Sequence, residues 1–148
     1  MNRLKQANHI LYDLGLLNEL NKYGKPHIIG SYKMNSMAWN DLDIDVENDS
    51  MSLDKLYQLT TYILNNFCPT WYEAKEEINE QGNKVWFQGF EFYLNNELWN
   101  VDIWFFDKDT IEKAEKYCDV ITEKVKYNEQ LRTSIIEIKQ ELIKKNLY

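Results

Sequence analysis

Apolar residues recur every three or four positions in four stretches of this chain. This spacing puts the apolar side chains on one side of a helix and therefore predicts amphipathic helices. The first stripe begins at Leu4 and ends at Leu20, Gly15 weakens it by about 1 kcal/mol relative to alanine, and Gly24 followed by Pro26 ends it. The predicted helices cover residues 2–23, 52–66, 107–122 and 127–147.

Shorter apolar or alternating runs predict five strands. Residues 70–78 mix charged and apolar side chains on both faces, which is typical of an edge strand. Two long runs flank Asn95-Asn96 and predict a hairpin. If these two asparagines form a two-residue turn, Gly89 lies opposite Asp102 and leaves open space above its carboxylate. The predicted strands cover residues 27–30, 41–47, 70–78, 84–94 and 98–106.

These elements together predict one domain of the α/β (α+β) class over residues 1–148. We expect a small mixed β-sheet with flanking helices in a core of about residues 5–106. The last two helices, over about residues 107–148, complete that core or form one wall of a cleft.

Composition narrows the possible partners and the cellular setting. The chain carries 17 Lys and Arg against 24 Asp and Glu, a net charge of −7, which argues against a nucleic-acid partner because such a partner needs a basic face. A small molecule or a protein fits this charge better. Cys68 and Cys118 are expected to be free thiols, since two cysteines do not make a disulfide scaffold. Without a signal-peptide core or a long apolar run, we expect a soluble, cytoplasmic protein with no membrane partner.

The strand at residues 41–47 carries the strongest chemical signal. Side chains alternate along a strand, so Asp41, Asp43 and Asp45 share one face and leave the apolar residues between them on the other. Carboxylates two positions apart lie within about 7 Å of one another and repel. No Lys or Arg is interleaved to neutralise them, and a divalent cation such as Mg²⁺ would do so.

A second signal precedes this strand. Gly30-Ser31 follows a short apolar run, and a glycine lets the backbone approach a ligand while a serine turn offers donors to a phosphate. A further aspartate, Asp102, lies within the apolar run that is predicted to form the second strand of the hairpin. In this order the motifs resemble the signature of the polymerase-β-like nucleotidyltransferase superfamily, with Gly30-Ser31, then Asp41-Leu42-Asp43, then Asp102. The small antibiotic nucleotidyltransferases and the minimal prokaryotic nucleotidyltransferases are most similar in size and layout.

This resemblance implies a nucleotidyltransferase fold and a metal-dependent transfer of an NMP from an NTP to a hydroxyl of a small molecule or protein. It implies that Asp41, Asp43 and Asp102 are catalytic and hold two Mg²⁺ or Mn²⁺ ions, with Asp45 among the ligands if the register is shifted. The resemblance also implies that Gly30, Ser31 and Lys33 bind the nucleotide. Lys33 is the only cation in the loop before Asp41. The base, ATP or another NTP, is left open, as is a homodimer that completes the acceptor pocket.

Two other interpretations fit the same residues. The loop of residues 32–40 lacks the arginines common in the superfamily, which favours a catalytically weak or inactive nucleotide-binding or interaction module, such as one half of a two-component pair. The second is an unrelated metal-binding or structural domain. Three cations lie in or directly before the last predicted helix: Lys126, Arg132 and Lys139. We expect them to lie on a solvated face of the helix, with the alternative that one of them reaches a triphosphate.

Overall fold

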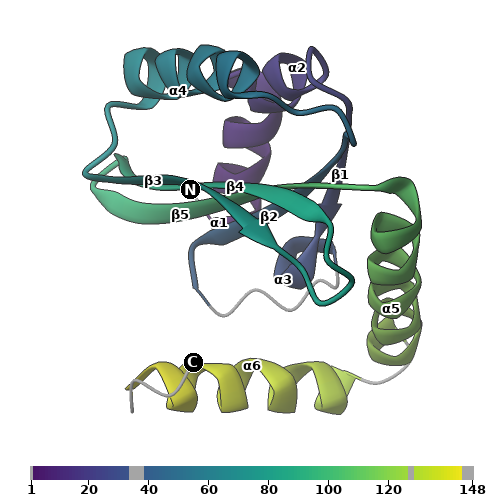
Figure 1. Ribbon diagram of the computed structural model, residues 1–148. Helices are drawn as coiled ribbons and strands as arrows, with labels where there is room; N and C mark the ends of the chain where they lie inside the picture. Colours follow the sequence, from purple (N-terminus) through teal and green to yellow (C-terminus); the bar gives the residue numbers. More distant parts are fainter. Residues whose placement is uncertain (1, 34–38, 127–128, 145–148) are drawn as a thin grey trace.

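The computed structural model describes residues 2–33, 39–126 and 129–144, and it confirms an α+β fold built on one mixed sheet (Figure 1). The elements follow the chain in this order: α1 Arg3–Asn8, the π-helix η1 His9–Asp13, α2 Leu16–Leu20, β1 Lys25–Ile29, α3 Gly30–Lys33, β2 Asp41–Glu47, α4 Leu53–Phe67, β3 Trp71–Ile78, β4 Lys84–Leu94, β5 Glu97–Phe106, α5 Lys108–Lys126 and α6 Glu129–Lys144.

The five strands lie in the order β1-β2-β5-β4-β3. Strands β2 and β5 are parallel, and the other neighbouring pairs are antiparallel. The hairpin register matches the sequence prediction, since Leu94 pairs with Glu97 and Gly89 pairs with Asp102. The prediction that residues 70–78 form an edge strand is confirmed as well, because β3 has a neighbour on one side only.

One face of the sheet is covered by the N-terminal helices and α4 and holds the main hydrophobic core (Figure 1). This face carries the buried apolar residues of β2 and β5, because successive side chains of a strand alternate between the two faces. They are Leu42, Ile44, Val46, Trp99, Val101, Ile103 and Phe105. The helices contribute a stripe of fully or nearly fully buried residues: Ala7, Ile10, Leu11, Leu16, Leu20, Leu56, Leu59, Ile63 and Phe67.

The single helix expected over residues 2–23 is wrong in detail. The segment divides into α1, η1 and α2, and Gly15 stands between η1 and α2 with a φ of +84°. Glycine adopts this left-handed conformation without steric cost, so the chain turns there instead of continuing the helix. The apolar stripe remains buried because both parts pack on the same face of the sheet.

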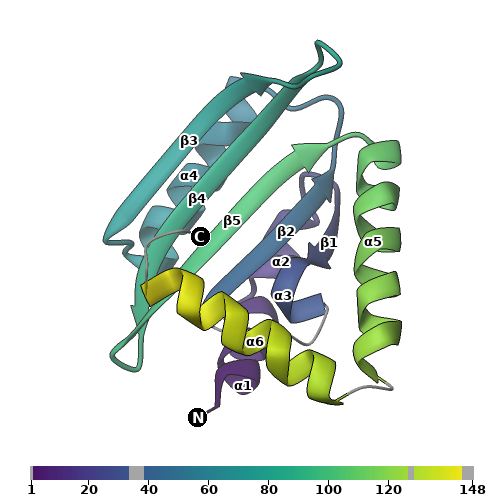
Figure 2. The same ribbon diagram turned by 90° about the horizontal axis from the view of Figure 1, so that it is seen from below.

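The opposite face of the sheet carries Asp41, Asp43 and Asp102 and is covered in part by the C-terminal helices (Figure 2). Helix α5 packs beside β1, α3 and β2, with Ile111 and Cys118 buried. Helix α6 runs beneath this face and crosses the ends of β2 and β5 at which these strands begin (Figures 1 and 2). Within the described residues, no helix is both long and apolar enough to cross a membrane.

The end of α4 offers a test of backbone strain. Cys68 caps this helix with φ 47° and ψ 58°, a left-handed conformation in which a Cβ costs about 1 kcal/mol. Because the Cys68 side chain is exposed, Cys68→Gly should remove that strain with little loss of packing and raise the free energy of unfolding by about 0.5–1 kcal/mol. Urea unfolding measures the change. Cys68→Ala is the control, since it keeps the Cβ, and an equal gain in both variants would contradict the prediction.

Candidate functional site

Two of the three candidate carboxylates lie directly beside each other on the parallel pair of strands. Asp43 of β2 pairs with Asp102 of β5, and Asp41 pairs with Asn100 one step along the same face. Parallel pairing therefore brings together residues that are far apart in the sequence. The period-two alternation of β2 puts Asp41 and Asp43 on the face away from the hydrophobic core, as the sequence predicted.

The glycine of the Gly-Ser motif lies directly against this group. Gly30 follows the end of β1, where Ile29 pairs with Asp43, and has a φ of +72°. A Cβ built on Gly30 would come within 2.5 Å of Asp43 Oδ2. Any side chain at this position would collide with the carboxylate, so the two halves of the sequence motif meet at one point. The side chains of Ser31 and Lys33 lie outside the described part of the chain.

Burial raises the pKa of each of these carboxyls, and repulsion from neighbouring carboxylates adds to the effect. The pKa of Asp43 rises to about 7, first through burial and then through the charges of Asp41, Asp102 and Asp45. Burial also raises the pKa of Asp41 to about 6, although Lys139 and Arg3 oppose this shift. The pKa of Asp102 is raised as well, chiefly by burial. These groups are therefore short of compensating positive charge.

Asp45 belongs to a different cluster, beneath α5. It is 1% exposed and pairs across the strands with His27. The ring of His27 contacts Glu115 of α5 through Nδ1, and its Nε2 lies 3.3 Å from Glu47 Oε2. Burial raises the pKa of Asp45 to about 7 against the opposing effect of His27. This arrangement favours Asp41 and Asp43, and not Asp43 and Asp45, as the Asp-x-Asp pair of the site. The sequence alone carried no signal for the contact between α5 and β1.

Among the cations of α6, Lys139 lies near the candidate site. Its charge acts on both Asp41 and Asp43, and burial lowers its own pKa. The expectation of a solvated face is therefore wrong for Lys139, which is half-buried. The side chains of Lys126 and Arg132 lie outside the described residues. At the other end of the chain, Arg3 donates from Nε to Asn40 Oδ1 over 3.0 Å, beside the start of β2.

The surroundings of Asp102 are aromatic on one side and acidic on the other. The expectation of open space over Asp102 is wrong in part, because a Cβ on Gly89 would meet Phe87 Cζ at 2.7 Å as well as Asp102 Oδ1 at 3.0 Å. The Phe87 ring packs on Trp104 with 4.6 Å between centroids. The charges of Glu91 and Glu73 act on Asp102 and help to raise its pKa.

The chemistry of this group suits a divalent cation. Mg²⁺ and Mn²⁺ prefer carboxylate oxygens, and Asp41 Oδ1 is buried without a hydrogen-bond partner among the described residues. As the side chains stand, no set of three or more His, Cys, Asp or Glu in the described ranges has the arrangement to hold a metal ion. The carboxylates of Asp41, Asp43 and Asp102 are thus suitable metal ligands by their chemistry, and their side chains would have to move closer together to bind one ion.

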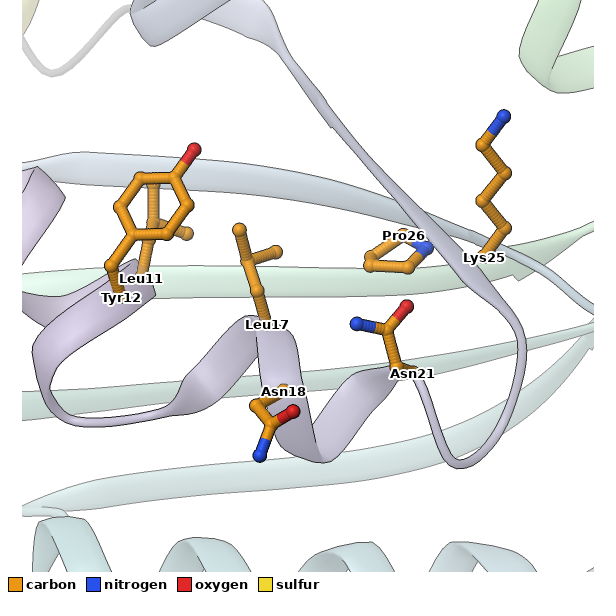
Figure 3. A pocket seen from close by; sticks show the side chains of 7 residues that line it. All are labelled: Leu11, Tyr12, Leu17, Asn18, Asn21, Lys25 and Pro26. Carbon is orange, nitrogen blue, oxygen red and sulfur yellow. The ribbon is translucent and has the colours of Figure 1, made fainter.

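A separate pocket of about 440 Å³ lies at the free edge of β1, between this strand and the η1–α2 segment (Figure 3). None of the candidate carboxylates lines it, so we assign it no part in the site. Its lining residues are Leu11, Tyr12, Leu17, Asn18, Asn21, Lys25 and Pro26.

Comparisons with known proteins give a structural relationship. No protein-family model matches the chain, and a search of curated proteins found no match. Among solved structures, the chain is similar to the Cid1 poly(U) polymerase in a MgGTP-bound crystal structure, with a TM-score of 0.61 and 14% sequence identity. The match covers 93% of this chain and 41% of the polymerase, so this chain spans about two fifths of its length. At this level of identity the similarity shows a shared fold, which is that of a nucleotidyltransferase.

The raised pKa values make a prediction about stability. Because the pKa of Asp43 rises from 3.8 to about 7, the folded protein keeps a proton that the unfolded chain loses above about pH 4. The stability that this group contributes is full below pH 4 and falls as the pH rises through 7. With metal removed by EDTA, Asp43→Asn should raise the free energy of unfolding at pH 8 by about 1–3 kcal/mol and flatten its decline between pH 5 and pH 8.

Urea unfolding at several pH values measures this effect. Asp49→Asn is the matched control, since Asp49 is an exposed aspartate just after β2. An Asp43→Asn variant with the pH dependence of the wild type would contradict the electrostatic account.

Proposed function

We propose that this protein is a metal-dependent nucleotidyltransferase, which moves an NMP from an NTP to a hydroxyl group of a small molecule or a protein. The observation that carries the proposal is the meeting of Asp41, Asp43 and Asp102 on two parallel strands, with the Gly30 backbone against Asp43. The fold shared with Cid1 agrees with this function. Within the superfamily, the small antibiotic and minimal nucleotidyltransferases are the subgroup that we propose.

Each residue has a role in this proposal. Asp41 and Asp43 would hold two Mg²⁺ or Mn²⁺ ions together with Asp102, and such ions supply charge neutralisation for the acceptor oxygen and the leaving pyrophosphate. Asp102 has its pKa raised by burial and by the charges of Glu91 and Glu73, and it is our candidate to accept the acceptor proton. Gly30 leaves room for the Asp43 carboxylate, and its backbone is a candidate contact to the nucleotide, with Ser31 and Lys33 as further candidates.

The charge around Asp102 bears on the acceptor. Glu73 and Glu91 both act on this carboxyl, and the whole chain carries a net charge of −7. A nucleic-acid acceptor would bring phosphates against these acidic groups without the basic surface that its binding needs. We therefore propose a small-molecule or protein acceptor, although the structural neighbour is described as a poly(U) polymerase.

The second candidate function is a catalytically weak or inactive nucleotide-binding module, such as one half of a two-component pair. The observation that favours it is the composition of the loop at residues 32–40, which has Lys33 as its only cation. Such a module would bind an NTP or a partner protein without turnover.

Nucleotide binding is the first test. Each of the four NTPs, added with Mg²⁺, is titrated against the wild type and Asp43→Asn in a thermal-shift experiment. A ligand at 100 times its Kd stabilises the folded state by about 2.7 kcal/mol, so one or more NTPs should raise the Tm of the wild type by several degrees. The shift should require the metal and Asp43. If no NTP at millimolar concentration shifts the Tm, both the enzyme and the nucleotide-binding module are wrong.

A pair of glycine variants separates the site from general backbone strain. Gly30 and Gly82 both have positive φ, +72° and +82°, but a Cβ on Gly82 meets nothing within 4 Å. Gly30→Ala should abolish the NTP-dependent shift because its methyl group would displace the Asp43 carboxylate. Gly82→Ala should lower the Tm through backbone strain alone and keep the shift. Retention of the shift in Gly30→Ala would contradict the proposed position of the nucleotide.

Transfer of label separates the enzyme from the module. The protein is incubated with α-³²P-labelled NTPs, Mg²⁺ and separate metabolite and protein fractions of a cell extract. An enzyme should move label to an acceptor, and Asp43→Asn should abolish the transfer. Binding of an NTP without transfer to either fraction would favour the module.

A further inference from the structure

Helix α6 presents a distinct face to the carboxylates. Ile135, Lys139 and Leu142 are half-buried and lie three or four positions apart, so they share one side of the helix. Glu137 and Gln140 are exposed. Helix α6 runs beneath the face of the sheet that carries the carboxylates, where β2 begins (Figure 2). The charge of Lys139 acts on Asp41 and Asp43, so this half-buried side of the helix faces the site. This placement brings Lys139 close to Asp41 and Asp43.

Lys139 supplies one positive charge to this group of carboxylates, and the charge of Arg3 also acts on Asp41. Lys139 opposes the effects of burial and repulsion on both Asp41 and Asp43. An ammonium group and a divalent cation would neutralise the same oxygens, so their binding is competitive wherever both cannot fit.

The attachment of α6 is weaker than that of α5. Helix α5 buries Ile111 and Cys118 and is joined to β1 by the contact between Glu115 and His27. By contrast, every described side chain of α6 is half-buried or exposed. Among the described side chains, α6 therefore buries less apolar area than α5, and a movement of α6 gives up less of this burial.

We propose that Lys139 is a built-in counter-cation of the carboxylate site, and that α6 covers the site until a divalent cation displaces the lysine. This inference rests on the proposed function, because it takes the carboxylates to be the metal ligands. In the covered state Lys139 neutralises Asp41 and Asp43. In the metal-bound state α6 withdraws and opens the carboxylate face to the nucleotide and the acceptor.

Metal affinity without nucleotide tests the competition. Mn²⁺ is titrated into the full chain, and free Mn²⁺ is measured by its electron paramagnetic resonance signal. Lys139→Gln should bind Mn²⁺ at least about fivefold more tightly than the wild type, the lower end of the usual range for coupling between sites. Lys139→Arg should bind like the wild type because it keeps the charge.

Lys144→Gln is the matched control, since Lys144 is an exposed lysine on the last turn of the same helix and its removal changes the net charge equally. It should leave the Mn²⁺ affinity unchanged. An equal gain in Lys144→Gln would show a long-range charge effect and overturn the proposal. A loss of affinity in Lys139→Gln would also overturn it, because Lys139 would then support metal binding.

Movement of α6 is measured separately by hydrogen–deuterium exchange of the full chain. Saturating Mn²⁺ should speed exchange in peptides from residues 130–142 and leave peptides from α5 unchanged. Slower exchange in α6 would mean that the helix closes on the bound metal, which is the opposite of the proposal.

The two proposals fail in different ways. If the wild type binds Mn²⁺ through Asp43 but Lys139→Gln binds with the same affinity, the metal site stands and the counter-cation is wrong. If neither the wild type nor Lys139→Gln binds Mn²⁺ at millimolar concentration, the metal site itself is wrong and the proposed function fails with it.

Discussion

Repulsion between carboxylates on neighbouring strands is the constraint around which this molecule is arranged. The parallel pairing of β2 and β5 puts Asp43 beside Asp102, with Asp41 one step away. Burial is the largest cause of the raised pKa of all three groups and repulsion from neighbouring carboxylates adds to it, so keeping these groups ionised in the folded protein costs free energy. A hydrophobic core on the opposite face holds the two strands together despite this cost, since Ile44 and Ile103 pair there and are fully buried.

The local pattern of the sequence predicted much of this arrangement. Alternation along residues 41–47 placed the aspartates on one face, and the Asn95-Asn96 turn gave the register that sets Gly89 beside Asp102. Both results depend on short-range geometry, which a single sequence expresses directly. The ordered motifs then predicted a nucleotidyltransferase fold, and the structure has that fold.

The parts that the sequence did not predict depend on tertiary contacts. The break at Gly15 follows from packing of α1 and α2 on one sheet, which outweighs the helical periodicity. The contact of His27 with Glu115 joins elements far apart in the sequence, and no local pattern marks it. Likewise, a stripe of apolar residues shows that α6 is amphipathic but not which surface it covers, so the approach of Lys139 to the aspartates was not predicted.

The parallel pair also makes the site dependent on complete folding. Asp43 and Asp102 belong to strands separated in the chain by α4, β3 and β4, so they become neighbours only after long-range contacts have formed. Contacts of this kind close large loops and form slowly. A partly folded chain that has only its hairpin, or only its N-terminal helices, therefore does not place Asp43 beside Asp102 and has no paired carboxylates for a cation to neutralise. Repulsion arises in the same step that completes the sheet, and a ligand that relieves it acts selectively on the native state.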